Sequence, residues 1–115
     1  MPPRSTLPAL IDIRDAIDRI GRYVAGRTEA ALDHDELLKD GVERCIEIIS
    51  EASRRIPADM KALHPDIRWA RIAGIGNILR HDYDEVDPTQ LWPIITDHLP
   101  PLRVAIESLI RRTAS

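Results

Sequence analysis

Near the N-terminus, apolar residues recur every three or four positions and charged residues fill the positions between them. The apolar positions are Leu10, Ile13, Ile17, Ile20 and Val24. This spacing leaves one stripe of a helix apolar and the opposite side polar. Pro8 suits the first turn of such a helix, and Gly26 supplies a stop. The pattern therefore predicts an amphipathic helix that ends before Gly26.

A second apolar stripe follows a short segment over residues 28–33, and Pro57 ends it. Its members are Leu38, Val42, Cys45, Ile49, Ala52 and Ile56. Ile46 and Ile48 lie off this stripe, so the predicted helix is apolar on more than one side. Such a helix lies either in the centre of a bundle or at a subunit interface. The pattern leaves both interpretations open.

A third helix is predicted to begin at Pro65 and Asp66. Its apolar residues are Ile67, Trp69, Ile72, Ile75, Ile78 and Leu79. Gly74 and Gly76 fall inside it, and each costs about 1 kcal/mol relative to alanine. Either close helix packing or a functional requirement would explain these two glycines.

The segment 81–88 is acidic and ends in proline, which predicts a loop and then a helix capped by Asp87. Leu91, Ile94 and Ile95 are expected to face the core. Pro100 and Pro101 should break this helix, because the residue before a proline is disfavoured in the α region. Leu102, Ile106 and Leu109 then continue a last helix. No period-two stretch predicts a strand.

These elements predict an all-α fold, an up-and-down four-helix bundle with short additional helices. The 115 residues suffice for a single domain, 1–115, in which residues 1–6 and 113–115 are expected to be disordered. The net charge of −3 argues against a broad non-specific nucleic-acid surface but allows a local basic cleft. With one cysteine, Cys45, expected to be buried, and no apolar run of about 20 residues, we expect a cytoplasmic protein without a membrane span.

The residue best placed for chemistry is His81, because imidazole exchanges protons near neutral pH. Asn77 lies four residues earlier on the same helical face, Arg80 precedes the histidine and Tyr83 follows it. The alternative is that His81 only ends its helix, where a cationic side chain interacts well with the dipole. The other histidines, expected to have surface or capping roles, are His34, His64 and His98.

Other chemistry is not expected. The acids of residues 82–87 lack the glycine and the terminal glutamate of a calcium-binding loop. No dinucleotide, P-loop, nucleophile-elbow or zinc motif occurs in the chain. We therefore expect no metal and no cofactor.

Residues 73–83 read Ala-Gly-Ile-Gly-Asn-Ile-Leu-Arg-His-Asp-Tyr and are followed by Asp-Glu-Val-Asp. This text resembles the signature of the HepT-like family of the HEPN superfamily, in which an arginine precedes a polar residue, three further residues, histidine, any residue and tyrosine. Three further segments are similar to the family, at residues 47–52, 64–69 and 99–102. The resemblance covers nearly the whole chain.

The resemblance implies a homodimeric, helical and metal-independent endoribonuclease, the toxin of a bacterial type VII-like toxin–antitoxin system. Its partner would be an MntA-like nucleotidyltransferase antitoxin, which in some systems inhibits the toxin by adding AMP to the motif tyrosine. In this chain His81 would be the motif histidine, Asn77 the polar residue and Tyr83 the site of AMP addition. The substrate would be RNA.

The motif arginine is missing, since Gly76 stands at its expected position. In the family's reaction the ribose 2′-hydroxyl attacks the adjacent phosphate, which requires a proton acceptor and a cation. His81 is the expected acceptor. Arg80 is the expected replacement for the cation because it lies four residues after Gly76, and Arg71 is the alternative.

Three hypotheses follow. The chain is an endoribonuclease toxin that uses His81, Asn77 and Arg80. Alternatively, it is a weakened or inactive family member that serves as binding partner of the nucleotidyltransferase and as its substrate at Tyr83. The third hypothesis is a helical homodimer whose polar helix end performs no chemistry.

Overall fold

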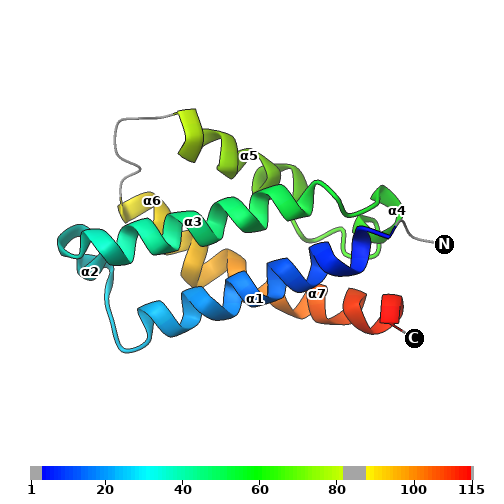
Figure 1. Ribbon diagram of the computed structural model, residues 1–115, viewed down its shortest axis with the longest axis horizontal. Helices are drawn as coiled ribbons and strands as arrows, with labels where there is room; N and C mark the ends of the chain where they lie inside the picture. The colour runs from blue at the N-terminus through cyan, green and yellow to red at the C-terminus, as the bar shows by residue number, and fades with distance from the viewer. Residues whose placement is uncertain (1–3, 82–87, 115) are drawn as a thin grey trace.

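Every regular element in residues 4–81 and 88–114, the part of the chain that the structure describes, is a helix. The structure is a computed structural model, shown in Figure 1. The elements in chain order are α1 (Thr6–Val24), α2 (Glu29–His34), α3 (Glu36–Ser53), α4 (Ala58–Lys61), α5 (Trp69–His81), α6 (Pro88–Pro93), the π-helix η1 (Ile94–His98) and α7 (Leu99–Ala114). None of them is long and apolar enough to cross a membrane. The predicted all-α, HEPN-like bundle is confirmed.

The long helix α3 lies in the middle of the bundle, with α1 along one side and α5 along another (Figure 1). The α3 stripe predicted from the sequence is buried throughout, and the off-stripe Ile46 is only 2% exposed. Of the two interpretations of this doubly apolar helix, the central position is therefore confirmed. Cys45 is fully buried at the α1-facing side, and burial raises the pKa of its thiol.

Pro100 and Pro101 do not break the last helix, so the prediction of a break was wrong. Leu99, just before them, has helical dihedral angles, φ −71° and ψ −40°. The preceding turn is a π-helix, in which the Leu99 N–H donates to the Ile94 carbonyl five residues earlier. The chain thus continues into α7 without an interruption.

The structure differs from the predictions at several helix ends. Residues Thr6 and Thr113, which we expected to be disordered, lie in α1 and α7, and Thr6 is fully buried. Helix α5 begins at Trp69 rather than at Pro65, since the short α4 and an irregular segment occupy residues 58–68. Gly26 has φ +71° just after α1, as its predicted role as a stop requires. The predicted cap Asp87 lies outside the described residues.

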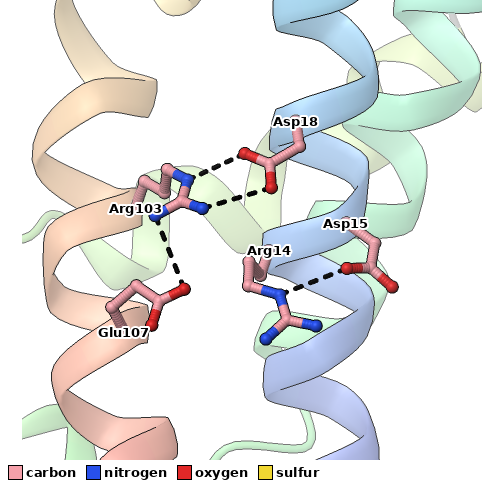
Figure 2. Close-up of polar contacts among 5 residues, drawn as sticks. All are labelled: Arg14, Asp15, Asp18, Arg103 and Glu107. Carbon is pink, nitrogen blue, oxygen red and sulfur yellow. Dashed lines mark hydrogen bonds and ion pairs between the residues drawn. The ribbon is translucent and has the colours of Figure 1, made fainter.

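A bidentate ion pair links α1 to α7 (Figure 2). Arg103 Nε and Nη2 donate to the two carboxylate oxygens of Asp18 at 2.8 and 3.2 Å. The hydrogen bonds from Arg103 hold the pKa of Asp18 below its ordinary value. Arg103 also contacts Glu107, one turn further along α7. The pair fixes the relative position of two helices that otherwise meet through apolar side chains.

We predict that Asp18 and Arg103 are energetically coupled across the helix boundary. Their side chains are 37% and 39% exposed, so solvent screening limits the coupling to about 0.5 kcal/mol. A double-mutant cycle with Asp18→Ala and Arg103→Ala in urea unfolding measures it. Because the pKa of Asp18 is lowered, the coupling is present near neutral pH and disappears as the pH falls through that lowered pKa. An Arg44→Ala variant is the control, since Arg44 pairs with Glu47 within α3. Coupling that is the same at neutral pH and below the lowered pKa of Asp18 would contradict the prediction.

Candidate functional site

Three of the four predicted site residues lie on α5. Asn77 is exposed near the C-terminal end of this helix, and position 81 is its last residue. At about 100° per residue, Ala73, Asn77 and His81 fall along one side of α5, each about 40° from the next. Position 80 is about 40° around the helix from position 76. The fourth predicted residue, Tyr83, lies outside the described residues.

A hydrogen-bonded link joins α5 to α3 beneath this side. The hydroxyl of Ser50, which is only 2% exposed, donates to the carbonyl of Ala73 at 2.7 Å. The same oxygen accepts from the amide N–H of Gly76 at 3.1 Å. A hydroxyl has one proton to donate and lone pairs to accept with, so Ser50 uses both capacities on α5. The link fixes the rotation and height of α5 against α3 at the residues just before Asn77.

Gly76 is buried in this contact, which bears on the missing arginine. Its amide is directed at Ser50 of α3, so the backbone at position 76 lies close to the neighbouring helix. Gly76 therefore lies at the contact between α5 and α3. An arginine at this position would have to emerge between α3 and α5.

The guanidinium of Arg54 lies beside the Ser50 link. Arg54 follows the last residue of α3, and its Nη2 donates to the carbonyl of Ala73 at 2.8 Å. The side chain is exposed, and among the described residues it has no carboxylate partner. The sequence did not single out this residue, because 23 positions separate it from Asn77 and no helical periodicity relates residues on two different helices.

The solvent-facing side of α5 carries small residues. Ala70 is exposed, and a Cβ added at Gly74 would meet no described atom within 4 Å. Gly74 is therefore not required for packing within the described part of the chain. Asn77 continues the same side towards position 81. Among the described residues, this side of α5 is exposed at Ala70 and Asn77.

A groove lies along α5, between this helix and α6, η1 and α7, and Gly74 is among the residues that line it. Arg71, Ile75, Ile94 and His98 line its middle, and one part of it encloses a cavity of about 110 Å³. Position 71 is about 120° around α5 from Asn77, so Arg71 does not share the side that carries the predicted site. His98, expected to be a capping or surface residue, also lines the groove. The structure thus separates Arg71 from the predicted site.

Within residues 4–81 and 88–114, no three His, Cys, Asp or Glu side chains come together as metal ligands. Along α5 the described residues supply the exposed amide of Asn77, the buried hydroxyl of Ser50 and the exposed guanidinium of Arg54, and the last two bind the Ala73 carbonyl. The molecule is thus an all-α protein with polar groups along the C-terminal half of one helix.

The chain belongs to the HepT-like family. The family model described as ribonuclease HepT-like matches residues 13–109. A Thermococcus cleftensis protein named "Probable ribonuclease HepT" is 36% identical over 106 residues, which cover 92% of this chain and 96% of that protein. Two Methanocaldococcus jannaschii proteins with provisional RNase names are each 29% identical over 111 residues, 96% of this chain. The matches cover 92% and 96% of those two proteins. No solved structure matches the chain.

We predict that Ser50→Ala loosens α5 from α3. Losing the two hydrogen bonds should lower the free energy of unfolding by about 1 kcal/mol. Amide hydrogen exchange at Gly76 should become faster, because its N–H loses the Ser50 acceptor. Ser53→Ala is the matched control, since the Ser53 hydroxyl is equally buried but donates to the Ser50 carbonyl within α3. Equal exchange rates at Gly76 in the two variants would show that the Ser50 link does not hold α5.

Proposed function

We propose that this protein is a metal-independent endoribonuclease, the toxin of a type VII-like toxin–antitoxin pair that acts on RNA in the cytoplasm. The observation that carries the proposal is the C-terminal part of α5, where Asn77 is exposed and the Arg54 guanidinium binds the Ala73 carbonyl one turn earlier, in a chain of the HepT-like ribonuclease family. The relatives' names refer to ribonucleases and supply the substrate class.

The proposed reaction needs no group beyond the chain's own side chains. His81 accepts the proton of a ribose 2′-hydroxyl, whose oxygen forms a bond to the adjacent phosphorus. The bond from phosphorus to the 5′-oxygen breaks, and the protonated imidazole or water returns a proton to that oxygen. Asn77 donates a hydrogen bond to the substrate. A cation stabilises the negative charge that grows on the phosphoryl oxygens.

We further propose that the active form is a homodimer formed through the open side of α5. Ala70 and Gly74 allow another chain to approach closely, and neither small residue is needed for packing among the described residues. The antitoxin would be an MntA-like nucleotidyltransferase that adds AMP to Tyr83. AMP on that tyrosine, two residues after His81, would place a bulky phosphate-bearing group beside the proposed site.

We expect purified protein to cleave single-stranded RNA, because position 81 supplies a proton acceptor. The His81→Ala variant should lose about 10²–10⁴-fold in rate, which is the usual contribution of general acid–base catalysis. EDTA should leave the rate of both proteins unchanged if no metal takes part. Cleavage of labelled RNA, followed on denaturing gels, measures these rates. A rate that does not exceed that of His81→Ala overturns the nuclease proposal.

The second candidate function is an inactive family member that serves as the partner and substrate of the nucleotidyltransferase. The specific observation that favours it is Gly76, buried against Ser50, at the position of the motif arginine. Co-expression with a nucleotidyltransferase of this kind should increase the intact mass by one AMP, and Tyr83→Phe should abolish the increase. An unmodified mass in the presence of an active nucleotidyltransferase contradicts AMP addition in both candidates.

A further inference from the structure

We infer that Arg54 supplies the cation of the active site, from α3 rather than from α5. The inference rests on the proposed ribonuclease function and names the residue that stabilises the charge on phosphorus. Gly76 has no side chain to perform this role. Arg54 is the described guanidinium that makes a hydrogen bond to α5, and it does so at Ala73, one turn before Asn77.

The Arg54 guanidinium lies near the predicted site along the axis of α5. Arg54 Nη2 lies 2.8 Å from the carbonyl oxygen of Ala73. Helical carbonyl groups point towards the C-terminus, so the guanidinium lies on the part of Ala73 that faces Asn77. Ala73 and position 81 are two turns apart, about 12 Å at most along the axis. A phosphate bound over Asn77 would therefore lie between the guanidinium and the residue that accepts the proton.

A side chain at position 76 would reach the part of α5 that the Arg54 guanidinium contacts. Side chains on an α-helix lean back over the turn that precedes their own Cα. A side chain at position 76 would extend over the level of Ala73, where the Arg54 guanidinium lies. Arg54 thus brings positive charge to the surface that an arginine at position 76 would cover. This positive charge comes from the end of α3 and not from α5.

Arg54 and its chain neighbour Arg55 differ in their partners. Arg55 is neutralised by Asp12 at 3.2 Å. Arg54 has no such carboxylate among the described residues and bonds only to a neutral carbonyl. A guanidinium has five N–H donors, so one bond to Ala73 leaves others for phosphoryl oxygens. Its orientation is set in advance by the carbonyl, which reduces the cost of ordering it when substrate binds.

Of the two cations predicted from the sequence, Arg71 lines the groove between α5 and η1 and lies about 120° around the helix from Asn77. The side chain of Arg80, which we favoured from spacing alone, is not among the parts of the chain that the structure describes. Arg54 acts by hydrogen bonding and charge alone, so no proton or covalent bond is transferred to it.

The experiment compares RNA cleavage by the unaltered full chain, Arg54→Ala, Arg54→Lys, Arg55→Ala and His81→Ala. Arg54→Ala should lower kcat by about 10²–10³-fold, the usual effect of removing one preorganised donor to a developing oxyanion. Lysine should restore part of the rate, since it keeps the charge but not the planar donor geometry. Arg55→Ala removes a neighbouring guanidinium already paired with Asp12 and should leave kcat unchanged.

Rescue by added guanidinium ion distinguishes loss of the catalytic cation from a structural effect of Arg54→Ala. Low concentrations of guanidinium ion should restore cleavage by Arg54→Ala, but not by His81→Ala, while circular dichroism should be alike for all five proteins. If the unaltered chain cleaves RNA and Arg54→Ala is equally fast, Arg54 is not the cation although the proposed function stands. The same conclusion follows if Arg54→Ala is slow, folded and insensitive to guanidinium. If the unaltered chain is no faster than His81→Ala, the proposed function fails and this inference fails with it.

Discussion

The arrangement of the site depends on one buried hydroxyl. Ser50 donates to Ala73 and accepts from Gly76, so a single oxygen holds two backbone groups of α5 against α3. Apolar contacts alone would allow a helix to slide or rotate by a fraction of a turn with little change in buried area. A hydrogen bond is directional, and leaving a buried polar group without a partner costs about 1–3 kcal/mol. The link therefore defines which side of α5 faces solvent, and that side carries Asn77 and position 81.

The apolar periodicity was sufficient to predict the helices that build the bundle. The stripes beginning at Leu10 and Leu38 are buried in the structure, because burial is what maintains a three-to-four spacing of aliphatic residues. The prolines at 100 and 101 were misjudged for the opposite reason. Local backbone preference disfavours a helical Leu99, but that residue is only 5% exposed and the π-helix before it accommodates the prolines. Tertiary packing overrode a local rule.

The candidate site was only partly accessible from the sequence. The spacing of residues within one helix can be predicted from the sequence, so Asn77 and His81 could be assigned to the same side of α5. The relative positions of residues on different helices could not be predicted. The rotation of α5 against α3 is set by Ser50 and Ala73, and neither residue stands out in the sequence. Arg54 is 19 positions from Ala73, and nothing in its local pattern distinguishes it from Arg55 next to it. Only the different partners, a carbonyl for one and a carboxylate for the other, separate the two arginines.

The absence of a side chain at position 76 does not by itself remove the charge that phosphate cleavage requires. A developing negative charge responds to the position of a nearby cation and to how firmly it is held, whatever element the cation comes from. Glycine at 76 lets the backbone of α5 approach Ser50, and that approach brings the Ala73 carbonyl within reach of the end of α3. The contact between α5 and α3 that buries Gly76 thus also supplies the acceptor that orients an arginine from α3. On this argument the glycine and Arg54 are parts of one arrangement, and a substitution at either position changes the geometry of the other.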